Sequence, residues 1–311
     1  MSKSLDRLTL LQTFVRIADA GSISAAARDL GLSQPSVSRQ LAELESRFNA
    51  QLMQRTTHDL SLTPVGAELL ADARRLLDSW EALEEKHLET EDALRGKLKV
   101  VAPIALGQLY LADTAFQFQK QHPLLSLSWQ LEDRNIRFAE VGCDCWIKIG
   151  SVPDESLTIE PLGQVERLMV AAPELLEVYH QPKSPGDLEI WPCVALEPFE
   201  GGRIPLSKSS GKTIVVSPSV RLVTNNIFAL HRAVLAGLGI AVLPRWFIEE
   251  DLNHGRLIDL LPQWRAPKLP IHVASLSKSY QPRRLQSFLE ILRTEIPNLP
   301  GVEPPVGMNP S

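Results

Sequence analysis

One segment, from Gly21 to Phe48, limits the fold of this 311-residue chain more than any other. Ser22 is a residue type favoured at helix N-caps, and apolar residues follow it at helical spacing until Gly31. Ser33 can cap a second helix, whose apolar residues recur at intervals of three and four. The pattern predicts two short helices that pack against each other across a turn. Their apolar positions are Ile23, Ala26, Ala27 and Leu30, then Val37, Leu41, Leu44 and Phe48.

The second of these helices leaves a polar face opposite its apolar stripe. Because successive helical residues turn by about 100°, Arg39 lies opposite that stripe, and Gln34, Pro35 and Ser38 flank it toward the helix N-terminus. Gln and Arg can form paired hydrogen bonds with base edges in the major groove, and a helix N-terminus attracts phosphate. This is the geometry of a helix-turn-helix. Periodicity alone also fits an ordinary helical hairpin with a solvated polar face.

The segment from Leu5 to Gly66 resembles the N-terminal domain of the LysR-type transcriptional regulators. The resemblance is carried by FVRIADAGSISAAARDLGLSQPSVSRQLAELE, followed by LMQRT and LTPVG. It implies a winged helix-turn-helix domain over residues 1–63, with Arg55 at the base of the wing. The residues expected to contact DNA are Ser22, Ser24, Ser33, Gln34, Pro35, Ser36, Ser38, Arg39 and Arg55.

Two further segments complete this expected domain. An opening helix is predicted over Leu5–Ala20, and two short strands with a polar tip at Thr56–Asp59 are predicted between Gln51 and Leu62. The opening helix carries one apolar stripe and a second apolar set on its shoulder. The stripe is Leu8, Leu11, Val15 and Ala18, and the shoulder is Leu10, Phe14 and Ile17.

A long linker helix is predicted over residues 64–95, with Thr63 as its cap and Pro64 in its first turn. Its apolar residues form a heptad-like seam, which is typical of helices that pair. The alternative is a helix that packs on its own domain; the acidic opposite face favours pairing, and the resemblance implies dimerisation. The seam runs through Leu69, Ala73, Leu76, Trp80, Leu83, His87, Thr90 and Leu94, and the first five are the expected dimer contacts.

From Gly96, expected to be a hinge, strands alternate with helices to about Ile296, which predicts a mainly parallel α/β sheet covered on both sides. VAPIALG, CDCWIKIG and AGLGIAVLP again resemble the family's effector-binding domain. The resemblance implies two α/β subdomains joined by two crossovers, as in periplasmic binding proteins, with a ligand cleft between them. The Pro-rich tail, residues 297–311, is expected to be disordered.

Ligands of such sheets bind beyond the carboxyl ends of strands, near helix N-termini. Segments 103–107 and 224–226 have this position, and their backbone and Asn amides suit a carboxylate, although Asn225 or Asn226 can instead simply cap the helix. Many relatives have Ser or Thr where Ala105 stands, so this chain lacks one hydroxyl donor. Its effector is therefore less polar, is held by backbone groups alone, or does not exist. The expected effector contacts are Pro103, Ile104, Ala105, Gly107, Gly150, Thr224, Asn225 and Asn226.

Several function classes find no support in the sequence. It lacks GxSxG, HExxH, P-loop and Cys/His metal patterns, so we expect no enzyme, cofactor or metal. Cys143 and Cys145 should share one face of a strand; packing explains them better than a redox or metal pair. No apolar run is long enough to span a membrane and no signal peptide is evident, so a cytoplasmic location is expected.

The sequence therefore favours a ligand-responsive transcriptional regulator. Its expected partners are double-stranded DNA with a promoter inverted repeat, an unknown small-molecule effector, and further copies of itself as a homodimer or a tetramer. The net charge of −5 implies that DNA affinity rests on a few placed cations. Two alternatives are a small-molecule binding protein built on the cleft alone, and an architectural DNA binder without an effector.

Overall fold

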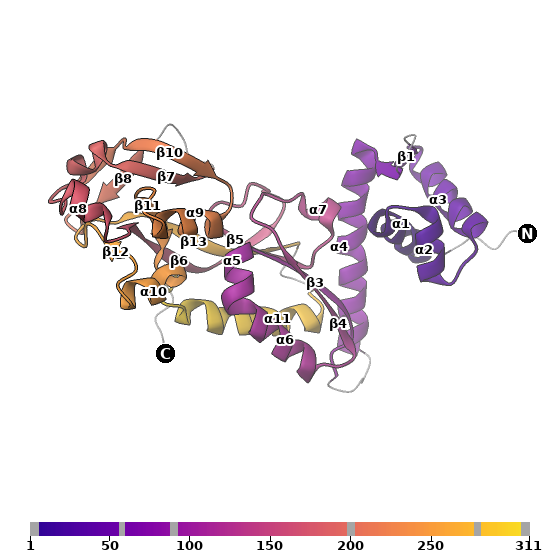
Figure 1. Ribbon diagram of the computed structural model, residues 1–311. Helices are drawn as coiled ribbons and strands as arrows, with labels where there is room; N and C mark the ends of the chain where they lie inside the picture. The colour runs from indigo at the N-terminus through magenta and orange to yellow at the C-terminus, as the bar shows by residue number, and fades with distance from the viewer. Residues whose placement is uncertain (1–5, 56–59, 88–92, 198–202, 277–280, 306–311) are drawn as a thin grey trace, which may run out of the picture.

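The computed structural model describes residues 6–55, 60–87, 93–197, 203–276 and 281–305. The molecule is elongated, with a small helical domain at one end, a long helix beside it, and an α/β region at the other end (Figure 1). The small domain comprises α1 (Arg7–Ala20), α2 (Ile23–Leu30), α3 (Gln34–Phe48) and the antiparallel pair β1 (Met53–Arg55) and β2 (Leu60–Leu62). This is the predicted winged helix-turn-helix. The predicted wing tip lies outside the described residues.

The core of this domain differs in two details from the sequence prediction. In α1 the shoulder residues are the buried ones, because α2 and α3 both pack on that side, whereas the predicted stripe is only half-buried. In α3, Phe48 is 53% exposed. It lies in the last turn of the helix, beyond the contact with α1, and Leu52 enters the core after it. The buried residues include Leu10, Phe14, Ile17, Ile23, Val37, Leu41, Leu44 and Leu52.

The linker helix, α4, runs from Pro64 to His87 and stands between the small domain and the α/β region (Figure 1). Thr63 begins it as predicted, since its hydroxyl accepts a hydrogen bond from Gly66 N at 2.9 Å. Two predicted seam positions are wrong. Ala73 is buried within its own chain, and Leu94 lies after the helix, in the core of the α/β region. His87 ends the described helix, and Thr90 lies outside the described residues.

The main sheet of the α/β region is mixed and not mainly parallel. Its order is β11-β6-β13-β5-β3-β4; β3 (Gly96–Ala102) is parallel to β4 (Leu125–Leu131) and β5 (Cys145–Ile149), whereas the pairs that involve β6, β11 and β13 are antiparallel. The prediction of a mainly parallel sheet failed because β6 (Thr158–Ala171) and β13 (Ala266–Ser275) are long antiparallel strands. The sequence pattern indicated a strand only in the C-terminal part of each. These two strands run in opposite directions and join the two subdomains.

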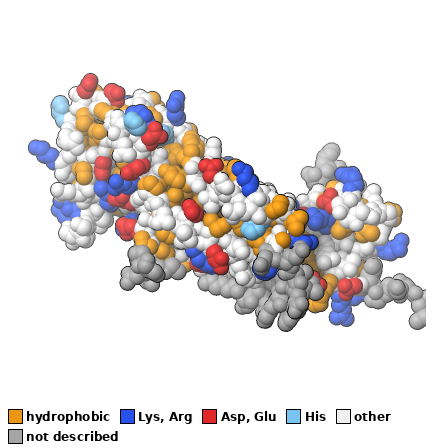
Figure 2. Space-filling view, turned by 90° about the horizontal axis from the view of Figure 1, so that it is seen from below, with side chains coloured by type: hydrophobic (Ala, Val, Ile, Leu, Met, Phe, Trp, Pro, Cys, Tyr) orange, Lys and Arg blue, Asp and Glu red, His pale blue; other side chains and the backbone are white. Residues whose placement is uncertain are grey.

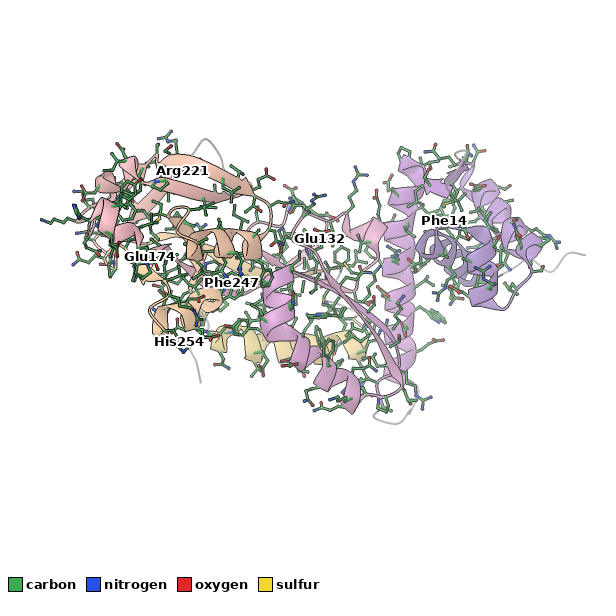
Figure 3. The ribbon with its side chains drawn as sticks, in the orientation of Figure 1. Phe14, Glu132, Glu174, Arg221, Phe247 and His254 are labelled. Carbon is green, nitrogen blue, oxygen red and sulfur yellow. The ribbon has the colours of Figure 1, made fainter. Side chains whose placement is uncertain are left out.

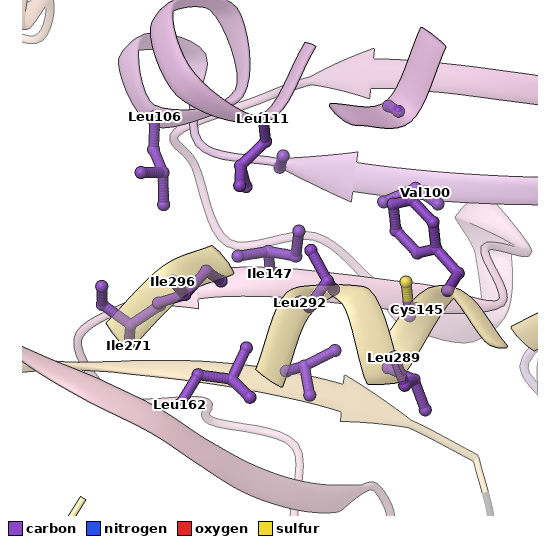
Figure 4. Packing of buried hydrophobic residues seen from close by; sticks show 14 of the residues in the cluster. Val100, Leu106, Leu111, Cys145, Ile147, Leu162, Ile271, Leu289, Leu292 and Ile296 are labelled. Atoms are coloured by element: carbon purple, nitrogen blue, oxygen red, sulfur yellow. The ribbon is translucent and has the colours of Figure 1, made fainter. Parts of the chain in front are cut away.

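Helices cover both subdomains. In the first subdomain, α5 (Ile104–Leu106), a π-helical turn over Gly107–Leu111 and α6 (Ala112–Gln121) continue from β3, and α11 (Arg283–Glu295) packs on the sheet. Figure 4 shows Leu289 and Leu292 of α11 beside Cys145 and Ile147 of β5.

The second subdomain is built around a shorter parallel strand pair and a separate hairpin. Its elements are α8 (Leu175–Tyr179), a 3-10 turn over Pro185–Ile190, β7 (Pro192–Leu196), β8 (Ile204–Ser207), β9 (Thr213–Val216), β10 (Ser219–Thr224), α9 (Ile227–Leu235), β11 (Ala241–Pro244), α10 (Arg245–Asn253) and β12 (Ile258–Asp259). A short helix, α7 (Phe138–Val141), belongs to the first subdomain and contacts α4.

The expected disorder of the tail is wrong for its first part. Residues 296–298 form a 3-10 turn, and β14 (Val302–Glu303) pairs with β6. A Cβ on Gly163 would lie 2.6 Å from Val302, so the glycine makes room for this strand. Proline content did not reveal the pairing because its partner is distant in sequence. Residues 306–311 lie outside the described part of the chain.

Candidate functional site

The helix-turn-helix presents the polar face that the sequence predicts. Gln34, Pro35 and Arg39 are exposed, and Ser36 and Ser38 are half-buried. Arg39 makes no hydrogen bond or ion pair within the described residues. An exposed cation without a protein partner remains available for phosphate or for a base edge.

Two serines of the expected DNA-contact set have a structural role. Ser22 accepts a hydrogen bond from Ala25 N at 3.0 Å and so caps α2, and Ser33 accepts one from Ser36 N at 3.4 Å and caps α3. Ser24 is exposed on α2. The side chain of Arg55 lies outside what the structure describes, so its position at the base of the wing stays a prediction.

The orientation of α3 depends on a polar contact that the sequence did not reveal. Gln40 is buried, and the hydroxyl of Thr13 on α1 donates a hydrogen bond to its Oε1. Gln40 is adjacent to Arg39, so this bond fixes the helix next to the residue that faces outward. Gln40 lies three residues after Val37 and four before Leu44, at the edge of the apolar stripe, and its contact with α1 accounts for its burial.

Cations are spread over the small domain. Arg47 pairs with Glu43 at 2.7 Å, and Arg16 lies 3.9 Å from Asp29. In Figure 2 the Lys and Arg side chains at this end protrude on several sides. Specific placement of a few side chains, and not a broad basic patch, is therefore what this surface offers DNA.

A cavity of about 1360 Å³ lies between the two subdomains. Six of the eight expected effector contacts line it: Pro103, Ile104, Ala105, Gly150, Asn225 and Asn226. Two do not. Gly107 packs on the core, where a Cβ would lie 2.4 Å from the side chain of Leu131, and the Thr224 hydroxyl accepts a hydrogen bond from Asn226 N at 3.2 Å.

At each of the two helix starts that were expected to bind a carboxylate, a side chain of the protein already accepts a backbone hydrogen bond. The carboxylate of Asp133 accepts a hydrogen bond from Ile104 N at 2.9 Å. The side chain of Asn226 accepts one from Ala229 N at 3.0 Å, which is the capping role that the sequence left open. Asn225 stays exposed at the cavity.

Four cations line the cavity, and none of them was among the expected effector contacts: Arg134, Lys148, Arg167 and Arg203. Lys148 on β5 donates a hydrogen bond to the carbonyl of Asp133 at 3.0 Å, and burial lowers its pKa. Arg167 on β6 donates to the carbonyl of Pro267 at 2.7 Å, and burial lowers its pKa too. Lys148 and Arg167 stand on different strands far apart in the sequence, so only the topology shows that both face one cavity.

The junction of α4 with the α/β region is a buried cluster of charges. Arg284 on α11 is 5% exposed; it lies 2.7 Å from Glu81 of α4 and 3.9 Å from Asp144. Asp78 of α4 belongs to the cluster, and burial, with help from the charge of Asp144, raises its pKa to about 7. A Cβ on Gly96 would lie 3.4 Å from a carboxylate oxygen of Glu81, so this residue borders the cluster, and its role as a hinge stays a prediction.

The cysteines do not form a reactive pair. Cys145 packs with the main core, whereas Cys143 precedes β5 and packs with a separate cluster around Phe138, so the expected shared face is wrong. Burial raises the pKa of Cys143 and of Cys193 to about 12. Such thiols are poor nucleophiles at neutral pH.

Comparison with known proteins accounts for nearly the whole chain. Residues 8–67 match the family model for the bacterial regulatory helix-turn-helix protein of the lysR family, and residues 91–297 match the model for the LysR substrate binding domain. The transcriptional regulator YhjC of Escherichia coli is 30% identical over 299 residues, which is 93% of this chain and 97% of that protein. The regulator PtxR of Pseudomonas aeruginosa is 29% identical, covering 95% and 96%.

Solved structures agree. CrgA, a LysR-type transcriptional regulator from Neisseria meningitidis, is 27% identical and has a TM-score of 0.58 over 94% of this chain and 99% of its own. A full-length variant of OxyR from Pseudomonas aeruginosa has a TM-score of 0.73 over 99% and 100%, and at 18% identity it supports the fold alone. None of the described helices is long and apolar enough to cross a membrane.

Proposed function

The chain belongs to the LysR family of transcriptional regulators, and we propose that it reads a promoter inverted repeat through α3 as a homodimer or tetramer and responds to a small molecule held between its subdomains. Its relatives are regulators of transcription and not enzymes. The observation that carries the proposal is Arg39, which is exposed and has no hydrogen-bond or ion-pair partner among the described residues, on a helix whose opposite face is buried. Because the proposed partner is chromosomal DNA, the proposed place of action is the cytoplasm.

The proposed DNA contacts fall into two groups. Gln34, Pro35, Ser38 and Arg39 face base edges in the major groove, because the first two turns of the recognition helix are the part that enters it. The serines contribute through their hydroxyls and through the helix N-termini that they cap, where backbone N–H groups suit phosphate. Arg55 would hold the backbone from the wing.

The proposed dimer contact is the outward face of α4. Leu76, Trp80 and Leu83 are 51%, 44% and 40% exposed, which is unusual for large apolar side chains at consecutive heptad positions. Burial of each against a partner helix would stabilise the dimer by about 1–2 kcal/mol. Leu69 packs partly on its own domain and would lie at the edge of this contact.

The effector response is assigned to the cavity. It is large enough for a small organic molecule, and both subdomains contribute to its wall, so a ligand there changes how they are held relative to each other. We place Pro103, Ile104, Ala105 and Gly150 on one side of this ligand, and Asn225 and Asn226 on the other.

The test of DNA reading compares Arg39→Ala with Arg221→Ala on two DNA fragments at fixed salt. Arg221 is an exposed cation of β10, far from α3, and serves as the matched loss of charge. We expect Arg39→Ala to lose about 1–3 kcal/mol on DNA from upstream of the protein's own gene and much less on scrambled DNA. Equal losses on both fragments would mean that Arg39 contacts phosphate only.

A further inference from the structure

Arg167 differs from several other arginines of the α/β region in the partners of its guanidinium group. Its hydrogen-bond partner is one backbone carbonyl, that of Pro267, which both Nε and Nη2 reach. No carboxylate pairs with it within the described residues. By contrast, five other arginines each lie within 3 Å of a carboxylate oxygen: Arg245 with Glu249 at 2.9 Å, Arg256 with Asp251 at 2.6 Å, Arg265 with Glu166 at 2.8 Å, Arg284 with Glu81 at 2.7 Å and Arg293 with Glu160 at 2.6 Å.

The guanidinium group of Arg167 therefore has unused capacity. A guanidinium carries five N–H donors. One from Nε and one from Nη2 are directed at Pro267, so about three remain, including both on Nη1. A partly buried cation without a counter-ion is costly, and a forked guanidinium matches a carboxylate in particular.

The acidic groups of the cavity do not satisfy this cation. Asp133 accepts from Ile104 N, and Glu132 accepts from Arg134 N at 2.9 Å, so both are engaged on the wall of the first subdomain. Lys148 on that wall has the charges of Asp133 and Glu132 near it. The wall of the first subdomain is thus close to charge-balanced, since Arg134 and Lys148 line it with Glu132 and Asp133. Elsewhere in the wall stand Arg167, Arg203 and Glu197; Arg167 is the half-buried cation of these, and Arg203 is exposed.

The rest of the wall is mostly apolar. Ile104, Ile149 and Leu269 line the cavity, and so does Trp246, which is 2% exposed and whose indole Nε1 has no hydrogen-bond partner in the described structure. These surfaces suit the hydrocarbon part of a ligand. A doubly charged phosphate is disfavoured, because Glu132, Asp133 and Glu197 also line the cavity and would repel it.

We propose that the cavity binds a monoanionic organic acid whose carboxylate is held by Arg167 and whose apolar part packs on Ile104, Ile149 and Trp246. This assignment rests on the proposed function of the cavity as the effector site. It moves the anion from the two helix starts, where side chains of the protein already accept backbone hydrogen bonds, to a side chain on β6. Because β6 joins the two subdomains and Arg167 is bonded to β13, the other joining strand, the ligand is anchored where their relative position is set.

The experiment measures thermal stabilisation of the full chain by matched pairs of a carboxylic acid and its primary amide. The pairs are benzoate with benzamide, phenylacetate with phenylacetamide, and hexanoate with hexanamide, each at millimolar concentration. The variants are Arg167→Gln, Arg167→Lys and the control Arg221→Gln, which lies on β10 outside the cavity and away from Glu132 (Figure 3). Calorimetry then gives the Kd of each acid that stabilises the protein.

We expect at least one acid to stabilise the wild type and its amide to bind about tenfold or more weakly, because the amide lacks the charge that the guanidinium pairs with. The affinity of Arg167→Gln for the acid should fall by the same factor. Arg167→Lys should retain part of the affinity, and Arg221→Gln should match the wild type. If Arg167→Gln does not fold, Arg167→Lys carries the test, since it keeps the charge and loses the fork.

Three results would overturn the assignment: amides that bind as well as acids, an undiminished acid affinity in the Arg167 variants, or no stabilisation of the wild type by any acid of the panel. DNA binding is measured separately and without ligand. Failure of the wild type to bind DNA would refute the proposed function and would leave the ligand result standing, so the two failures are distinguishable.

Discussion

The surface of α3 and the junction of α4 with the α/β region both depend on arginine, in opposite ways. Arg39 on α3 is exposed and has no partner in the described protein. Arg284 at the junction is buried and has Glu81, Asp144 and Asp78 around it. The difference separates a cation kept for an external partner from one that holds two parts of the chain together.

Arg167 lies between these extremes, since it is partly buried yet lacks a carboxylate partner within the described residues. Arg39 and Arg167 are thus the cations proposed for external partners, one for DNA and one for an organic anion, and Arg284 forms a structural connection between the two parts of the chain that carry them. The connection matters for regulation, because α4 follows directly on the DNA-binding domain and its Glu81 is paired with Arg284 of the effector domain.

The largest expected effect follows from removal of the junction cation. Arg284→Met leaves Asp78, Glu81 and Asp144 without their buried counter-charge, so the free energy of unfolding should fall by about 3–5 kcal/mol. Urea denaturation followed by circular dichroism measures it, with Arg221→Met as an exposed control expected to change stability by less than about 0.5 kcal/mol. A similar small change in both variants would show that the junction contributes little.

A second large effect concerns the outward face of α4. Trp80→Glu places a charge in the proposed helix pair and should weaken self-association by about 100-fold or more, which corresponds to roughly 2.7 kcal/mol. Sedimentation velocity measures the oligomer, and Trp80→Phe should preserve it. An unchanged sedimentation coefficient for the charged variant would mean that this face is simply solvent-exposed.

A smaller effect distinguishes the junction from α3 by its pH dependence. Asp78 has a pKa raised to about 7 by burial first and by Asp144 second, against 3.8 in its ordinary state. The folded state therefore binds a proton more tightly than the unfolded state, so this contribution to stability is complete below about pH 4 and is lost as the pH rises through 7.

Asp78→Asn should remove this loss of stability with rising pH. At pH 8 it should raise the free energy of unfolding on the order of 1–2 kcal/mol, after allowance for the partial exposure of the side chain. Melting temperatures from pH 4 to pH 8 provide the measurement. If the melting temperature of the variant depends on pH as that of the wild type does, another titratable group causes the dependence.

The smallest effect is predicted for the stability of Arg39→Ala. Since Arg39 is exposed and makes no hydrogen bond or ion pair among the described residues, the free energy of unfolding should change by less than about 0.5 kcal/mol while DNA recognition is lost. Denaturation of the variant without DNA is the check. A loss above about 1.5 kcal/mol would mean that Arg39 has a structural role, and the contrast with Arg284 would fail.

The small domain could be predicted closely because its signals are local. Ser22, Gly31 and Ser33 mark the helix ends within a few residues of the stripes that they delimit, and the structure places caps at these positions. Gln40 could not be identified as buried, because its partner, Thr13, lies in another helix. The exposure of Phe48 could not be predicted either, because it depends on how α3 packs against the rest of the domain.

The α/β region was harder because its strands depend on distant partners. β6 contains Pro161, which argues against a strand interior. The pairing with β13 accommodates it at a register irregularity between Ile271 and His272. In the cavity, the glycines and asparagines of the helix starts could be predicted from their local motifs, whereas no local motif marks Arg167. Its lack of a carboxylate partner among the described residues can be seen only when β6 and β13 are paired in the structure.

Footprinting with purified protein on DNA from upstream of its own gene tests the central claim most directly, namely that a pair of recognition helices reads DNA while α4 holds their spacing. We expect two protected half-sites, with a distance between their centres of about one helical turn, roughly 10–10.5 base pairs, or a multiple of it. Arg39→Ala should lose this protection. Uniform protection along the fragment, or a pattern that Arg39→Ala leaves unchanged, would contradict it.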